Sequence, residues 1–246
     1  MAKLTGQKDN LKDLLTLKNE TAEEADLYFY GDIVSSWWGA WDDTDQYPDS
    51  VKKFLEGAAG KNINVHINSG GGAVFAGITI YNMLKHFDGQ VTVYVDGMAA
   101  SIASVIAMAG DRIVLRTGAS LMVHKPSAVL WGGYNADELQ QMAAQLDEIQ
   151  KCIVQVYKEH KAEGADLNEI EEAVNKETWL TSDEAAALFN VEIETSLQAV
   201  ACKSEYIAKF LDCPPQYAQG EENRADIETV KAEYEILNLG GYQSDL

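Results

Sequence analysis

The chain has 246 residues, a size that suits one α/β domain of about 200 residues with additional ends. Its hydrophobic content of 46% is ordinary for a globular protein with a core. With 39 acidic and 19 basic residues the net charge is −20, which excludes direct binding to nucleic acid because phosphates require a basic surface.

The N-terminal part is predicted to contain an arm and a first strand. Residues 1–23 are polar and charged and form the predicted arm, and residues 26–33 read as a strand. Three tryptophans follow at Trp37, Trp38 and Trp41. Tryptophan is enriched at binding hot spots, so core or lid packing on the one hand and an interface or peptide groove on the other remain equal alternatives for this cluster.

The central part alternates between strands and helices. Strands are predicted where apolar residues alternate or cluster, over residues 63–67, 91–95, 113–115 and 121–123. A helix is predicted over residues 73–86, and the alanine-rich run 99–109 is a second helix. This order is typical of a right-handed parallel α/β unit.

A long amphipathic helix is predicted over residues 135–160. It starts with a capping box from Asn135 to Glu138, and apolar residues then recur at spacings of three and four. Similar boxes predict short helices that begin near residues 166 and 181, and residues 227–239 resemble a further charged helix. The long helix is long enough to project beyond the core.

The cysteines and the lack of long apolar runs bear on the compartment. Cys152, Cys202 and Cys213 have no short paired spacing, which favours a reducing environment over disulfides or a zinc site. The N-terminus lacks the apolar core of a signal peptide, and no apolar run approaches the roughly 20 residues that span a bilayer. We therefore expect a cytoplasmic protein without a metal, a cofactor or a membrane partner.

Three groups of residues at predicted strand ends could carry chemistry. Residues 70–72 are a glycine triplet between a strand and a helix, where bare N–H groups can approach a substrate, and no phosphate-loop pattern is present. Ser101 heads the alanine-rich helix, where it is either a helix cap or a nucleophile. His124 ends a strand, and its neutral imidazole could accept the proton of the Ser101 hydroxyl.

Three motifs in order resemble the Clp-type (caseinolytic) serine peptidases. They are INSGGGAVFAG at 67–77, GMAAS at 97–101 and LMVHKP at 121–126. The stretches ETW at 177–179 and SDEAA at 182–186 are most similar to the bacteriophage and prophage branch, which is often encoded with head-maturation genes. The resemblance covers roughly residues 25–195. It implies a Clp-protease/crotonase-like α/β fold of repeated strand–helix units with a projecting handle helix.

The resemblance also implies roles for individual residues. Ser101 matches the nucleophile and His124 the general base, while Gly72 and Ile102 match the backbone donors of the oxyanion hole. The helix at 135–160 matches the handle through which rings of subunits pack. Accordingly, residues 24–198 are expected to form the peptidase domain and residues 199–246 an acidic C-terminal extension.

The third residue of the catalytic triad departs from the family pattern. Aligning Trp179 with the family's aromatic residue puts the expected carboxylate at Ala173, and the nearby candidates are Glu172, Asn175 and Glu177. Asn175 is favoured because phage relatives often carry an aspartate there, and Glu172 is the alternative. An amide can orient a histidine but cannot stabilise the imidazolium as a carboxylate does.

The sequence thus predicts a serine endopeptidase that acts on a protein or peptide substrate. It would work in prohead maturation or as a Clp-like subunit, in homo-oligomeric rings, with a separate ATP-driven unfoldase or with phage capsid proteins as partners. A weakly active or silent ring-forming scaffold is the alternative. A crotonase-like coenzyme A enzyme is disfavoured, and so is a Ser–Lys peptidase that would use Lys125, because His124 fills the base position.

Overall fold

The computed structural model describes residues 23–40, 42–195, 207, 210 and 213–214. Almost all of the predicted N-terminal arm, Trp41, Cys202 and the helix predicted at 227–239 lie outside the described residues. Among the described helices, none is long and apolar enough to cross a membrane.

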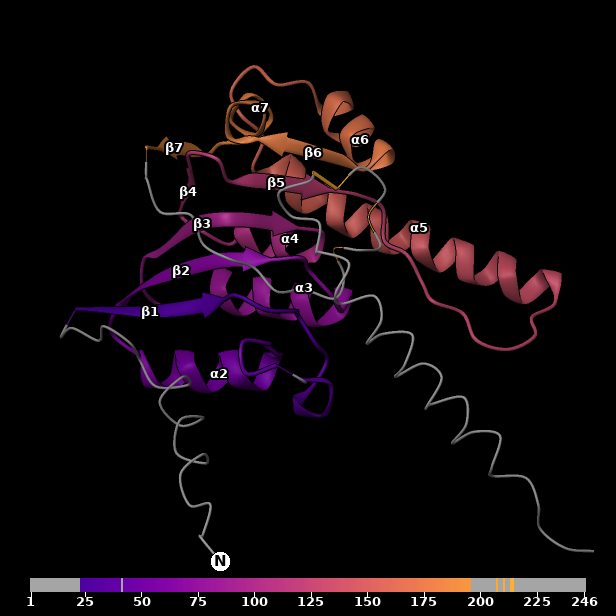
Figure 1. The fold of residues 1–246 in the computed structure, drawn as a ribbon, viewed down its shortest axis with the longest axis horizontal. Helices are drawn as coiled ribbons and strands as arrows, with labels where there is room; N and C mark the ends of the chain where they lie inside the picture. The colour runs from indigo at the N-terminus through magenta and orange to yellow at the C-terminus, as the bar shows by residue number, and fades with distance from the viewer. Residues whose placement is uncertain (1–22, 41, 196–206, 208–209, 211–212, 215–246) are drawn as a thin grey trace, which may run out of the picture.

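One mixed seven-stranded sheet forms the centre of the molecule (Figure 1). Its strands are β1 (Glu24–Phe29), β2 (Asn62–Ser69), β3 (Val91–Ala100), β4 (Arg112–Arg116), β5 (Ser120–Val123), β6 (Thr178–Thr181) and β7 (Glu192–Glu194). The order β1-β2-β3-β4-β7 is parallel throughout, β5 pairs in parallel with the end of β3, and β6 pairs antiparallel with β5. The predicted α/β fold of repeated strand–helix units is confirmed.

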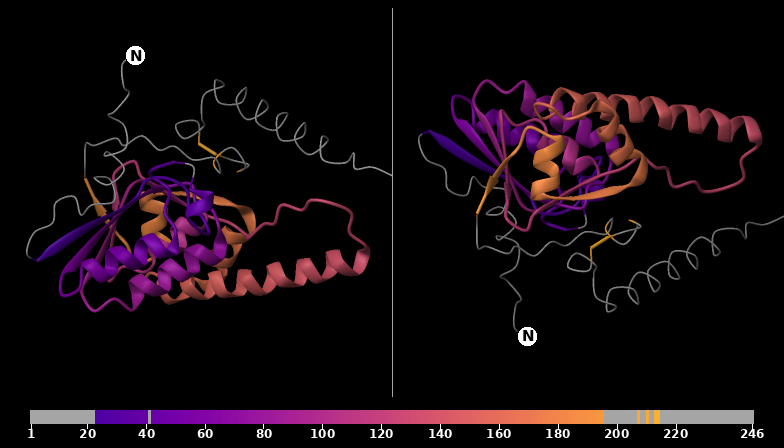
Figure 2. Two further views of the ribbon diagram at one scale, coloured as in Figure 1. Left: turned by 90° about the horizontal axis from the view of Figure 1, so that it is seen from below. Right: turned by 90° about the horizontal axis from the view of Figure 1, so that it is seen from above.

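The described helices pack mainly against one face of this sheet. They are η1 (Trp37–Gly39), α2 (Pro48–Gly57), α3 (Val74–Lys85), α4 (Ile102–Ala107), α5 (Ala136–Glu159), α6 (Leu167–Lys176) and α7 (Ser182–Leu188). Helix α5 begins at the predicted capping box and projects far beyond the sheet (Figures 1 and 2). Helix α2 was not predicted. It begins with a proline at its first position, and the Ser50 hydroxyl accepts a hydrogen bond from the Tyr47 N–H.

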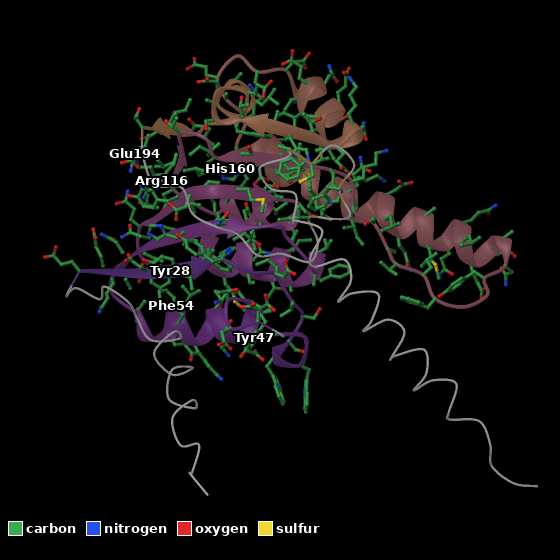
Figure 3. All side chains as sticks on the ribbon, viewed as in Figure 1. Tyr28, Tyr47, Phe54, Arg116, His160 and Glu194 are labelled. Atoms are coloured by element: carbon green, nitrogen blue, oxygen red, sulfur yellow. The ribbon has the colours of Figure 1, made fainter. Side chains whose placement is uncertain are left out.

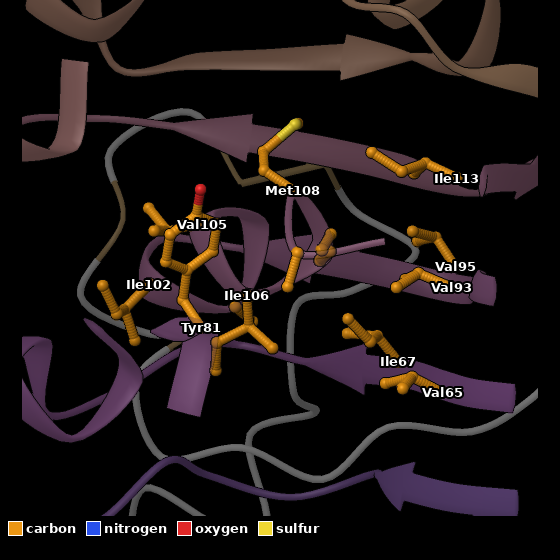
Figure 4. Close-up of a cluster of buried hydrophobic side chains, with 14 of the residues drawn as sticks. Val65, Ile67, Tyr81, Val93, Val95, Ile102, Val105, Ile106, Met108 and Ile113 are labelled. Carbon is orange, nitrogen blue, oxygen red and sulfur yellow. The ribbon is translucent and has the colours of Figure 1, made fainter. Parts of the chain in front are cut away.

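The main core lies between the sheet and helices α3 and α4. Alternate residues of the strands, such as Val65 and Ile67 of β2, point into one buried cluster that also contains Ile102 and Ile106 of α4 (Figure 4). Gly77 of α3 lies against Ile102 so closely that a Cβ atom there would come within 2.1 Å of it. Close packing of α3 on α4 therefore depends on that glycine.

The two described tryptophans of the cluster, Trp37 and Trp38, are not part of the core. Trp37 and Trp38 are 56% and 74% exposed, and their rings stack with centroids 3.6 Å apart. Core packing is therefore wrong for these two residues, and lid packing and an interface or peptide groove remain the hypotheses.

The other side of the sheet carries a row of polar aromatic side chains. Tyr28 of β1, His66 of β2 and Tyr94 of β3 stack nearly parallel, with ring centroids 4.8 and 5.2 Å apart. The guanidinium of Arg116 lies over the Tyr94 ring at 5.3 Å. Figure 3 labels Tyr28 and Arg116, which mark the two ends of this row.

Asp96 joins this row into a network, because three donors surround its buried carboxylate. The Tyr30 hydroxyl and His66 Nδ1 lie 2.7 and 2.8 Å from Oδ2, and Arg116 Nε lies 2.6 Å from Oδ1. Burial acts to raise the pKa of the Asp96 carboxyl, but the hydrogen bonds from His66 and Tyr30 and the nearby charges outweigh burial and lower that pKa.

Replacing this carboxylate should destabilise the fold. In Asp96→Asn the amide would present N–H groups to donors and remove the negative charge that lies 2.6 Å from Arg116 Nε, so we expect a loss of about 3 kcal/mol in urea unfolding at pH 7. Exposed Asp88→Asn is the control and should stay within about 0.5 kcal/mol. Because the folded pKa of Asp96 is lowered, its contribution is full above the ordinary carboxyl pKa and disappears as pH falls through the folded value. An equal difference at pH 7 and pH 3 would contradict this account.

Candidate active site

Ser101 stands at the turn between β3 and α4 in a strained backbone conformation. Its φ of 56° and ψ of −128° are unusual for a residue with a side chain. The N–H of Ser101 donates to the Met122 carbonyl at 3.0 Å, and this bond helps to hold the turn. The side chain makes no capping hydrogen bond to α4, so the helix-cap alternative for this serine is wrong.

The hydroxyl of Ser101 instead faces His124. Its Oγ lies 2.7 Å from His124 Nε2, within ordinary hydrogen-bond distance. In the parallel pairing of β3 with β5, Ala100 lies opposite Met122. This pairing brings the C-terminal ends of the two strands, and with them Ser101 and His124, to the same edge of the sheet. Strand β3 was predicted to end at Val95, but its last residues pair with β5, and this extension is what positions Ser101.

The environment of His124 favours a neutral imidazole. Burial lowers the pKa of His124, and the negative charge of Glu177 only partly opposes that effect. A neutral ring can accept the proton that Ser101 must lose in order to become a nucleophile. This is the protonation state that a general base requires.

The nearest described carboxylate to the other nitrogen of His124 belongs to Glu177. Its Oε2 lies 3.9 Å from Nδ1, and the two side chains are 18% and 16% exposed. Antiparallel pairing explains the contact, because Val123 lies opposite Thr178, so the residues just beyond them, His124 and Glu177, are neighbours across the ladder. Glu177 has a left-handed backbone conformation, with φ of 52°, where α6 turns into β6.

The residues favoured from the sequence for the third position have other contacts. Asn175 is exposed on α6, and its Oδ1 accepts a hydrogen bond of 3.1 Å from Gln150 of α5. Glu172 is exposed and pairs with Lys176 at 2.9 Å. The structure therefore brings neither Asn175 nor Glu172 into a described contact with His124. The register of β6, which no local pattern revealed, is what places Glu177 next to His124.

The glycine triplet lies beside Ser101. A Cβ atom on Gly71 would come within 2.7 Å of the Ala100 carbonyl oxygen and of Ser101 Cβ, and its φ of 97° also favours glycine. Ile33 bonds to the Gly71 carbonyl and to the Ala73 N–H, each at 2.7 Å.

Ile102 is the second residue expected to contribute an N–H group to an oxyanion hole. It is the first residue of α4, and the first N–H groups of a helix have no partner within the helix. It follows Ser101 directly, and a Cβ atom on Gly71, the residue before Gly72, would lie 3.2 Å from the Ile102 nitrogen. Gly72 and Ile102 therefore remain the expected donors. Such an arrangement can stabilise negative charge on an oxygen bound next to Ser101.

A buried hydrogen-bond chain supports the turn from below. The Ser104 hydroxyl donates to the Ser101 carbonyl at 2.5 Å and lies 2.8 Å from the hydroxyl of Tyr157, which is fully buried on α5. These contacts fix the turn to the base of the projecting helix.

Comparison with known proteins gives consistent matches. The family described as Clp protease matches residues 53–188. ATP-dependent Clp protease proteolytic subunit 1 of Chlamydia abortus is 37% identical over 145 residues, which cover 56% of this chain and 73% of the relative. The corresponding subunit of Porphyromonas gingivalis is 31% identical over 129 residues, with 51% and 56% covered. A point mutant of ClpP1 from Listeria monocytogenes has a similar fold, with a TM-score of 0.56 and 24% identity over 70% of this chain and 92% of that chain.

Proposed function

The chain belongs to the Clp protease family and is a serine-type peptidase, and we propose that Ser101, His124 and Glu177 carry its catalysis. The observation that supports this assignment is the 2.7 Å contact between a strained serine and a half-buried histidine at one sheet edge. The proposed reaction is hydrolysis of internal peptide bonds in a protein substrate.

The proposed mechanism has two steps, acylation of Ser101 and hydrolysis of the acyl ester. Ser101 Oγ attacks the substrate carbonyl carbon while His124 Nε2 takes the hydroxyl proton, and the N–H groups of Gly72 and Ile102 stabilise the resulting oxyanion. The C–N bond then breaks as His124 gives its proton to the leaving amine, which leaves an acyl ester on Ser101. Water attacks that ester with His124 again as base. The bond between the acyl carbon and Ser101 Oγ then breaks as His124 returns the proton to Oγ, which releases the carboxylic acid product and regenerates the serine.

Glu177 has the orienting role in this proposal. A carboxylate near Nδ1 favours the tautomer with its proton on Nδ1, so that Nε2 is free to accept from Ser101. It also stabilises the imidazolium that forms during both steps. This role replaces the one expected for Asn175.

The biological setting in which the peptidase acts is a separate proposal. The motifs at 177–179 and 182–186 favour a phage or prophage enzyme that acts in the cytoplasm on capsid proteins during prohead maturation. The names of the relatives, ATP-dependent Clp protease subunits, favour the second setting, in which a separate unfoldase delivers the substrate.

Ring assembly through α5 is proposed for either setting. The loop before α5 and its first turns expose large apolar side chains, including Trp131 at 81%, Val129 at 69% and Leu139 at 45%. Such a surface on a projecting element is typical of an association surface.

A fluorophosphonate probe distinguishes the peptidase from a silent scaffold. We expect the purified protein to react stoichiometrically and to hydrolyse a fluorogenic peptide, with the label mapped by mass spectrometry to Ser101. Mapping matters because Ser104 lies only three residues away, although it is fully buried. A protein that neither reacts nor cleaves would instead support the scaffold.

A further inference from the structure

Residues beyond the predicted peptidase domain pack behind the strands that carry the site. Ala99 and Leu121 point toward the helix-covered core, whereas Met98, Ala100 and Met122 point to the opposite side of β3 and β5. Ile207 covers this second cluster and is only 1% exposed. A side chain buried to that degree is part of the domain's packing.

Phe210 extends this packing to the catalytic histidine. Its ring lies edge-on to the His124 ring, with centroids 5.2 Å apart at 76°, and edge-on to Trp179 at 5.9 Å and 71°. The Phe210 N–H donates to the Ile207 carbonyl at 3.2 Å, and this hydrogen bond holds the two residues together. Edge-to-face contacts of this kind are favourable beyond simple burial.

We propose that Phe210, anchored through Ile207, is a positioning residue that holds the His124 imidazole and excludes water from it. The C-terminal extension would thereby complete the active site. This inference rests on the proposed role of His124 as general base. Ser101 remains half-buried and within hydrogen-bond distance of His124 while Phe210 is in place. Phe210 therefore shields His124 without displacing Ser101.

The groups that face His124 define the expected pH behaviour. They are the Ser101 hydroxyl from the β3–α4 turn and the Glu177 carboxylate from the α6–β6 turn. The Cys213 thiol of the C-terminal segment lies nearby, packed against the cluster behind β3 and β5. Burial is the main cause of the lowered pKa of His124, and Glu177 opposes it. Burial is the main cause that raises the pKa of the Cys213 thiol, and the nearby charge of Glu177 is the second. Removing the apolar wall should therefore raise the pKa of His124.

Phe210→Ala tests the proposal through its pH profile. We expect kcat to fall about two- to tenfold with KM little changed, which is the range expected for one lost aromatic contact. The acid limb of kcat/KM should move to higher pH, because a better solvated imidazole is protonated more easily. Phe210→Leu keeps apolar volume and should stay close to wild type. Deletion of residues 215–246, which keeps Ile207 and Phe210, should also retain the wild-type profile.

Direct titration of the histidine by NMR separates this inference from the proposed function. In the Ser101→Ala background, Phe210→Ala should still raise the pKa of His124, whether or not the enzyme cleaves peptides. If Phe210→Ala does not fold, Phe210→Leu and Phe210→Val form a volume series in which that pKa should rise as volume falls. An unchanged pKa and kcat would overturn the proposal. A clear gain of activity would also overturn it, since it would mean that the segment blocks the site.

Discussion

Ser101→Ala is expected to abolish both peptide cleavage and fluorophosphonate labelling. The substitution removes the oxygen that lies 2.7 Å from His124 Nε2, and no other described hydroxyl occupies that position. In one well-studied serine protease, loss of the nucleophile costs about 2 × 10⁶ in kcat. We expect kcat to fall by a factor of at least about 10³, and any activity that remains would come from the oxyanion hole and substrate binding alone.

His124→Ala should give nearly the same loss, and the double variant should lose little more. Members of a catalytic unit act together, so their separate losses do not add. Both variants should keep their stability within about 1 kcal/mol of wild type in urea unfolding, because neither hydroxyl nor ring anchors the main core. Full peptidase activity of Ser101→Ala would disprove the proposed site.

The core of the site could be predicted because its residues stand at strand ends. Parallel strands bring their carboxyl ends to one edge, so Ser101 and His124 meet although 23 positions separate them. The glycine triplet was recognisable for a similar reason, since backbone that approaches Ser101 as closely as Gly71 does cannot carry a side chain. These features follow from local sequence and from general rules of sheet topology.

The remaining features depend on tertiary pairing that no local pattern encodes. Glu177 reaches His124 only because β6 pairs antiparallel with β5, and an alignment anchored on Trp179 gives no view of that register. Helix α2 was missed, although Pro48 at its first position was a local signal. Phe210 lies in a segment read only as an acidic extension, and only the folded chain shows that it contacts His124.

Glu177→Gln should identify the third member of the site. The substitution keeps the size of the side chain but removes the charge 3.9 Å from Nδ1. At an effective dielectric constant of about 20, a unit charge at that distance contributes up to about 4 kcal/mol, and water at this partly exposed position screens some of it. We therefore expect kcat to fall about 10- to 100-fold, less than the roughly 10⁴-fold loss seen where an aspartate bonds directly to the histidine.

Asn175→Asp is the matched control, two residues away on the exposed side of α6. Its side chain bonds to Gln150, so we expect kcat to change by less than about twofold. The two variants also differ in pH behaviour. The charge of Glu177 raises the pKa of His124, so Glu177→Gln should lower that pKa and move the acid limb of kcat/KM to lower pH, opposite to the shift expected for Phe210→Ala. If Asn175→Asp instead raises activity strongly while Glu177→Gln leaves kcat and the acid limb unchanged, the orienting position belongs to residue 175 and the assignment of Glu177 is wrong.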